Sequence, residues 1–466
     1  MKTEILLDHE PTGNGYLVRA LLRITGDAPE GTDRRRLNLG VVLDRSGSMA
    51  ALGKLDRARE AARLLVRRLD PEDVLSIVAY DDDVRTIARR LPGSRHQDLL
   101  DAIATIQPGG MTNLSGGWLR GSELVGAERD RRQGTGSGTG TSTDGGTDGG
   151  TGERPSTDLE AVDRVLLLTD GLANVGITDG TQLRGLVASA AARGVTTTTI
   201  GFGADFEERL LRGLADAGGG STYYIEEPDQ APAVFEAELE GLMSLAAQNV
   251  AVTVAPASAA GITAVHHQYP RQQNDDGTLR LELGDLYALE PRSLLMEFLI
   301  SGDDGAEVDV ATLTLEGYVL QPGGGLEKRS VTLPIRVSRA GGPVVDPVVR
   351  RELLLLEAAR VREAAVEDRA NGDFAAGGRK LRRLAERMAP MAADPEIRDE
   401  VEDLRDLAEK FSAAEVSASD AKWMYQRAYS SGRSRPKSME SLSAARALKR
   451  EGARGTRDRE ADGDGR

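Results

Sequence analysis

The chain has 466 residues, no cysteine and a formal net charge of −15. The lack of cysteine excludes disulfides, thiol catalysis and thiolate metal ligands, and the acidic balance argues against a general nucleic-acid-binding protein, which needs clustered Lys and Arg. A chain of this length predicts about three domains; aromatic residues make up only 4% of it, so their cores must consist of Leu, Val, Ile and Ala.

The first segment, Met1–Pro11, contains an apolar run that is too short for a signal peptide. No stretch of the sequence reaches the roughly 18 consecutive apolar residues of a membrane helix. We therefore expect a cytoplasmic protein that does not contact a membrane.

Strand patterns open the chain, and an alternation of strands and helices follows. Residues 1–30 contain the strand patterns Thr3–Leu7 and Gly15–Ile24. Residues 37–248 alternate as in a doubly wound, Rossmann-like α/β domain. The expected strands are Leu37–Leu43, Val74–Tyr80, Val84–Leu91, Val162–Thr169, Val195–Phe202 and Ser221–Ile225, and the expected helices are Leu55–Leu69, Gln97–Ile106, Leu114–Glu128, Thr181–Arg193, Phe206–Ala217 and Ala231–Ala247.

A segment of low complexity interrupts this alternation. Residues 134–160 consist largely of Gly, Thr, Ser and Asp, a composition typical of flexible linkers. Because the segment joins the end of a helix to the start of a parallel strand, we expect a disordered insertion at the edge opposite the strand carboxyl ends.

Short strand patterns return in residues 249–340, with turns such as Asp275–Gly277 between them. Their spacing predicts a β-sandwich. If residues 1–30 supply strands to the same sandwich, the α/β domain is an insertion in it; otherwise the sandwich simply follows the α/β domain.

Helical patterns dominate residues 346–415. Asp346 is a helix cap with Pro347 at the first helical position. The expected helices are Val348–Arg369, Phe374–Met388 and Ile397–Phe411, which predict a helical hairpin or bundle.

The composition of residues 417–466 predicts a largely disordered tail. Its segment 423–429 contains Trp423, Tyr425 and Tyr429, a concentration of aromatic residues that is unusual for this chain. Such a segment is a candidate anchor, which docks either onto the protein itself or onto a partner.

The strand Leu37–Leu43 ends in Asp44, and Ser46 and Ser48 follow at alternate positions. One carboxylate and two hydroxyls are hard oxygen ligands, which suit Mg²⁺, Mn²⁺ or Ca²⁺ better than Zn²⁺. The same residues could instead form a helix cap and a turn.

Two further oxygen donors lie downstream. Thr112 belongs to the glycine-rich loop 108–113, and Asp170 follows the apolar strand Val162–Thr169. The carboxyl ends of parallel strands gather at one sheet edge, where ligands bind, so Asp44 and Asp170 are expected to meet there. The acidic run Asp81–Asp83 is interpreted as a solvated hairpin turn and not as a set of ligands.

This set, DxSxS at Asp44, Ser46 and Ser48 with Thr112 and Asp170, resembles the metal-ion-dependent adhesion site of von Willebrand factor type A (VWA) domains. The resemblance covers about residues 37–248. It implies that the five residues hold Mg²⁺, Mn²⁺ or Ca²⁺, directly or through water, and that one open coordination position takes a carboxylate from a partner protein. Relatives often work beside AAA+ ATPases or in signalling assemblies, so the resemblance implies an AAA+ ATPase or a signalling protein as a candidate partner.

Three functions compete. The first is a metal-dependent protein-binding module, and the second is a scaffold in which the metal is structural and the β-sandwich or the helices bind the partner. The third, a metal-dependent hydrolase, is disfavoured because Ser46 stands where haloacid dehalogenase phosphatases carry an acid/base aspartate. No GxGxxG or Walker motif is present, so we expect no enzyme activity.

Overall fold

The computed structural model describes residues 1–13, 15–27, 35–135, 161–203, 206–301, 307–320, 326–338 and 342–434. The chain forms two compact units. The α/β unit comprises residues 27–250 and 316–330, and the sandwich–helix unit comprises residues 1–26, 251–315 and 331–466.

The α/β unit is built on a six-stranded sheet of order β5-β4-β3-β6-β7-β8, in which only the edge strand β5 is antiparallel. The central strand β3 is apolar along almost its whole length because both of its faces are buried. The strands are β3 (Arg36–Asp44), β4 (Val74–Tyr80), β5 (Val84–Pro92), β6 (Ala161–Thr169), β7 (Thr196–Phe202) and β8 (Gly219–Ile225).

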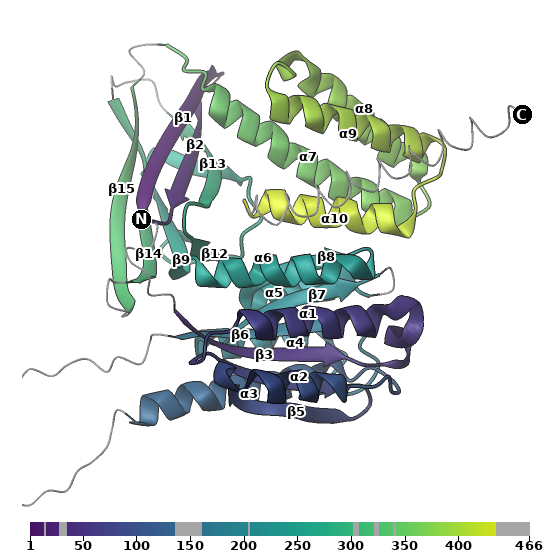
Figure 1. Cartoon of the computed structure of the whole chain (residues 1–466). Coiled ribbons are helices and arrows are strands. Elements are labelled where there is room, and N and C mark those ends of the chain that lie inside the picture. Colours follow the sequence, from purple (N-terminus) through teal and green to yellow (C-terminus); the bar gives the residue numbers. More distant parts are fainter. Residues whose placement is uncertain are drawn as a thin grey trace, which may run out of the picture. The chain divides into compact units, whose positions relative to one another are not determined.

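Helices flank this sheet, as the alternation predicted (Figure 1). One face is covered by α3, α4 and α5, whose Trp118, Val187 and Leu214 pack in one core with Val42 of the sheet. Helices α1, α2 and α6 form a second group, in which α1 packs against both α2 and α6. The helices are α1 (Lys54–Arg68), α2 (His96–Ala104), α3 (Leu114–Thr135), α4 (Gly180–Ala192), α5 (Glu208–Ala217) and α6 (Ala231–Met243).

The predicted helix Ala231–Ala247 is too long. Helix α6 ends at Met243, and Leu245 already begins strand β9 (Leu245–Pro256). Leu245 and Ala247 are buried at alternate positions along that strand. Pairing within a sheet therefore overrides the helix propensity of this Leu-Ala-Ala run.

The predicted insertion, residues 134–160, falls mostly outside the described residues, which resume at Ala161. Helix α3 continues to Thr135, beyond its expected end at Glu128. Ala161 pairs with Arg36, the first residue of β3. The chain therefore re-enters the sheet at the edge opposite Asp44.

Within its described ranges the sandwich–helix unit contains two sheets, of order β1-β2-β13-β10 and β11-β12-β9-β14-β15. Strand β2 pairs with both β1 and β13, so the α/β unit is inserted between neighbouring strands of one sheet. The strands are β1 (Lys2–Thr12), β2 (Gly15–Thr25), β10 (Ala260–Val265), β11 (Arg271–Gln273), β12 (Leu279–Tyr287), β13 (Pro291–Ser301), β14 (Glu307–Leu320) and β15 (Leu326–Ser338), and β9, β14 and β15 have residues in both units.

Four α-helices follow in the described residues of this unit, and three of them follow the predicted ranges: α7 (Pro347–Ala370), α8 (Phe374–Met388) and α9 (Pro395–Ser412). The prediction of a largely disordered tail from residue 417 is wrong for its first part, because Ala418–Gly432 forms helix α10. Ser417 and Asp420 make a reciprocal capping box at its start. Residues 435–466 lie outside the described residues.

None of the helices that the structure describes combines the length and the apolar character that a transmembrane span needs.

Arg362 on α7 is a buried charged residue among the helices of the sandwich–helix unit. Its guanidinium is 1% exposed, forms ion pairs with Glu400 and Asp403 of α9, and lies 5.9 Å from the ring centre of Trp423. Removing one partner of a buried ion pair leaves the other charges uncompensated, which costs more than the pair contributes.

We therefore expect Arg362→Leu to lower the free energy of unfolding of the sandwich–helix unit by about 3 kcal/mol. The chain has two tryptophans, Trp118 in the α/β unit and Trp423 on α10, so denaturation of a Trp118→Phe background followed by fluorescence reports on Trp423 alone. The exposed Arg383→Leu on α8 is the control. Equal unfolding midpoints for both variants would contradict the role given to Arg362.

Candidate metal centre

The two aspartates of the candidate site lie at the carboxyl ends of neighbouring strands. Asp44 is the last residue of β3, and Asp170 directly follows β6. The two strands run parallel with Leu43 opposite Leu168. Both aspartates are fully buried, so the chain holds two carboxylates out of water at one sheet edge.

The DxSxS turn connects these aspartates through hydrogen bonds. The backbone N–H of Ser46 donates to Asp44 Oδ1 at 2.8 Å, and the Oγ atoms of Ser46 and Ser48 lie 3.2 Å apart. Ser48 Oγ donates to Asp170 Oδ1 at 2.7 Å, while Thr169 Oγ1 donates to Asp44 Oδ2 at 2.7 Å. Four predicted residues are thus in one hydrogen-bonded chain, with Thr169 as an additional support.

Thr112 joins them from the loop before α3. Asn174 fixes its backbone: Thr112 N–H donates to Asn174 Oδ1 at 2.8 Å, and Asn174 N–H donates to the Thr112 carbonyl at 3.2 Å. A Cβ atom on Gly171 would lie 3.5 Å from Thr112 Oγ1 and 3.9 Å from Ser48 Oγ. Both hydroxyls therefore face the same glycine beside Asp170, and all five predicted residues come together.

The donor set fits a hard divalent cation. It offers two carboxylates and three hydroxyls, without nitrogen or sulfur, which suits Mg²⁺, Mn²⁺ or Ca²⁺. Across the part of the chain that the structure describes, no cluster of three or more His, Asp or Glu side chains is arranged to hold a metal. A cation site in these residues therefore depends on its hydroxyls.

Burial is the largest cause that raises the pKa of Asp44, and the neighbouring charge of Asp170 acts in the same direction. Hydrogen bonds from Ser46 and Thr169 favour the ionised form, and the resulting pKa is about 6. A cation bound to this carboxylate would favour the ionised form as well.

Sequence reasoning missed the role of Asp81. It interpreted Asp81–Asp83 as a solvated turn, but Asp81 is 4% exposed and pairs with the buried Arg45 at 2.7 Å. Asp81 Oδ2 also accepts the N–H of Gly110 at 2.9 Å. The pKa of Asp81 lies below its ordinary value: burial alone would raise it, but the hydrogen bonds from Gly110 and Asp83 and the charge of Arg45 outweigh burial.

This pair fixes the glycine-rich loop against the DxSxS turn. Gly109 N–H donates to the Arg45 carbonyl at 2.7 Å, and Gly47 N–H donates to the Gly110 carbonyl at 2.9 Å. A Cβ on Gly109 would overlap the Asp81 carboxylate. The glycines are therefore needed for close approach, and the loop that carries Thr112 is held by a buried ion pair.

Lys54, the first residue of α1, was also missed. Its Nζ lies 2.7 Å from Asp170 Oδ2, and the two side chains are 7% and 0% exposed. No spacing rule relates a lysine at the start of one helix to an aspartate 116 residues later.

The aromatic candidate anchor packs on its own unit. Tyr429 is 2% exposed, and Trp423 and Tyr425 are half-buried on α10. The Arg427 guanidinium lies 5.2 Å from the ring centre of Trp423. These side chains therefore stabilise the attachment of α10 to the helical bundle.

We expect Asp81→Asn to weaken Mg²⁺ binding by about tenfold, because groups that orient metal ligands typically affect affinity by 10- to 100-fold. Calorimetric titration of Mg²⁺ checks this. Asp83→Asn, which removes the same charge from an exposed neighbour, should leave the affinity unchanged. Equal affinities in the two variants would show that the Arg45–Asp81 pair does not support the site.

Comparisons with known proteins agree with the fold. The chain is 28% identical over 273 residues to the uncharacterized protein YfbK of Escherichia coli (strain K12), which covers 57% of this chain and 42% of YfbK. It is 28% identical over 205 residues to human inter-alpha-trypsin inhibitor heavy chain H3, which covers 43% of this chain and 20% of the heavy chain. The matches thus span less than half the length of these relatives.

Two solved structures resemble both units in fold. The von Willebrand factor type A protein from Catenulispora acidiphila has a TM-score of 0.64 at 19% identity and covers 86% of this chain and 89% of its own. The ArnB paralog VWA2 from Sulfolobus acidocaldarius has a TM-score of 0.56 at 16% identity, covering 92% and 97%. The model of the von Willebrand factor type A domain family matches residues 38–237. This match and the doubly wound sheet identify residues 38–237 as a von Willebrand factor type A domain.

Proposed function

We propose that the chain is a metal-dependent protein-binding module. Asp44, Ser46, Ser48, Thr112 and Asp170 would hold Mg²⁺, or Mn²⁺ or Ca²⁺, and the cation would accept an acidic side chain of a partner protein. The observation that carries the proposal is the convergence of these five oxygen donors at one sheet edge, where the aspartates are buried while Ser48 is exposed. VWA domains in general mediate metal-dependent protein interactions.

Exposed apolar side chains on the same loops favour a protein partner over a small ion or metabolite. Leu52, Met111 and Leu172 are 86%, 56% and 54% exposed. Leu52 follows the DxSxS turn, Met111 precedes Thr112, and Leu172 follows the Asp170-Gly171 pair. We call these three residues the apolar rim. Apolar side chains beside a charged centre are typical of protein interfaces.

The identity of the partner is proposed from family resemblance alone. We propose an AAA+ ATPase or a signalling protein that presents a carboxylate, and we propose binding without catalysis. The net charge of −15 gives no support to a nucleic-acid partner.

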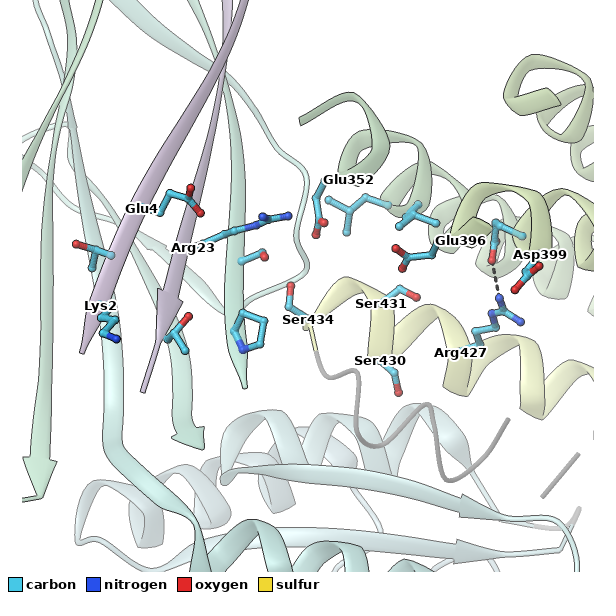
Figure 2. A pocket seen from close by; sticks show the side chains of 17 residues that line it. Lys2, Glu4, Arg23, Glu352, Glu396, Asp399, Arg427, Ser430, Ser431 and Ser434 are labelled. Carbon is cyan, nitrogen blue, oxygen red and sulfur yellow. Dashed lines mark hydrogen bonds and ion pairs between the residues drawn. The ribbon is translucent and has the colours of Figure 1, made fainter. Parts of the chain in front are cut away.

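A cavity in the sandwich–helix unit supports a second candidate, a scaffold in which the metal is structural. The cavity has a volume of about 990 Å³ and lies between the β1-β2 strands and helices α7, α9 and α10 (Figure 2). Carboxylates predominate among its charged groups, which include Glu4, Arg23, Glu352, Glu396, Asp399 and Arg427. In this alternative a basic segment of the partner would bind in the cavity.

Thr112→Ala separates the two candidates. The substitution removes one hydroxyl from the metal set and leaves the cavity unchanged. We expect it to abolish Mg²⁺-dependent retention of the partner in a pull-down, with an unchanged circular dichroism spectrum. Glu396→Gln, which alters only the cavity, should retain the partner. Retention of the partner by Thr112→Ala together with its loss in Glu396→Gln would support the scaffold.

The apolar rim has its own test. We expect the double variant Met111→Ser, Leu172→Ser to weaken partner retention at least tenfold, because buried apolar anchors supply much of an interface's affinity. Its Mg²⁺ affinity in calorimetry should equal that of the wild type. Leu119→Ser, at an exposed apolar residue on α3, is the control. Equal retention by rim and control variants would exclude the rim from the interface.

A further inference from the structure

Lys54 places an ammonium group beside one of the two candidate metal-binding carboxylates. The Lys54 ammonium lies 2.7 Å from Asp170 Oδ2, while Asp170 Oδ1 accepts the Ser48 hydroxyl at 2.7 Å. One oxygen of this carboxylate thus faces the hydroxyl ligands, and the other faces the lysine. Both side chains of the ion pair are buried, so water screens their interaction weakly.

The Lys54 side chain lies close to the backbone. Gly53, with a φ of 69°, ends the 3-10 segment Gly47–Gly53, and Lys54 begins α1 directly after it. Gly203, also at a φ of 69°, follows β7, and a Cβ there would lie 3.4 Å from both Cε and Nζ of Lys54. The lysine end is therefore packed against backbone and does not extend into solvent.

We propose that Lys54 is a built-in counter-charge that sets the net charge of the metal centre, weakening its hold on the cation and strengthening its hold on an anionic partner group. This inference rests on the proposed metal site and concerns its regulation.

The proposal rests on the net charge of the groups at the metal centre. Asp44 and Asp170 contribute two negative charges, and Lys54 cancels one of them. The nearby Arg45–Asp81 pair is neutral as a whole. A divalent cation therefore leaves the centre with one net positive charge, which attracts a carboxylate. Without Lys54 the loaded centre would be neutral, and it would bind the cation more tightly and an anion more weakly.

A purely structural role for the ion pair makes a different prediction. If Lys54 only anchors the start of α1 to the end of β6, its removal would lower stability but would not change cation and anion binding in opposite directions. The opposite signs of the two effects are therefore the signature of a counter-charge.

The test measures Mn²⁺ affinity by calorimetry in the full-length protein, with and without acetate as the anion probe. We expect Lys54→Met to bind Mn²⁺ at least about tenfold more tightly than the wild type, because one repulsive charge at close range is removed. Acetate should raise the apparent Mn²⁺ affinity of the wild type and have a smaller effect on the variant, since linked ligands strengthen each other's binding reciprocally.

Three further variants control for folding and charge. Lys54→Gln keeps a hydrogen-bond donor near Asp170 without the charge and should behave like Lys54→Met, so either neutral variant suffices if the other fails to fold. Lys54→Arg keeps the charge and should behave like the wild type. Arg67→Met removes a charge from the exposed side of α1 and should have no effect.

The outcomes separate the inference from the proposed function. Wild-type protein that binds no Mn²⁺ would overturn the proposed metal site itself. Wild-type protein that binds Mn²⁺, with Lys54→Met and Lys54→Gln binding it equally or less tightly, would overturn the counter-charge alone. Equal acetate effects in wild type and neutral variants would also overturn it.

Discussion

The parallel pairing of β3 with β6 determines where the chemistry of this protein can occur. It brings Thr169 within 2.7 Å of Asp44, a residue 125 positions earlier, and sets Asp170 beside the DxSxS turn. A shift of either strand by one residue would turn each of its buried apolar side chains to the opposite face of the sheet and disrupt the packing there. The register that builds the core therefore also builds the candidate metal centre. Ser46, Ser48 and Thr112 join the two aspartates there from the segment between the two strands.

Two buried ion pairs fix the parts of the site that the strands do not position. The Arg45–Asp81 pair holds the loop that carries Thr112, and Lys54 pairs with the Asp170 oxygen that does not accept the Ser48 hydroxyl. Buried ion pairs contribute little net stability, but they fix geometry and local charge. In this domain the two ion pairs lie beside the proposed metal site, where they fix the positions of Thr112 and Asp170 and the local charge. The same two pairs therefore support both the structure of this sheet edge and the proposed binding of an acidic partner.

Sequence reasoning predicted the strands and the five candidate ligands because both follow local patterns: apolar runs that end in Asp44 or Asp170, and a glycine-rich loop at Thr112. It could not find Lys54 or the role of Asp81, since their partners are set by tertiary packing. It also wrongly predicted disorder for residues 418–432, because that prediction rested on their polar composition. The capping box Ser417–Asp420 and the spacing of the buried Met424 and Tyr429 indicate a helix. Local signals of that kind were present in the sequence.

The most direct test of the account is to locate the cation. Crystals soaked in Mn²⁺ and measured at its absorption edge give an anomalous peak at each bound ion. The account predicts one peak among Ser46, Ser48 and Thr112, with a remaining coordination position open to solvent or to an acidic side chain. No peak there at saturating Mn²⁺, or a peak only at the carboxylates of the cavity in the sandwich–helix unit, would contradict it.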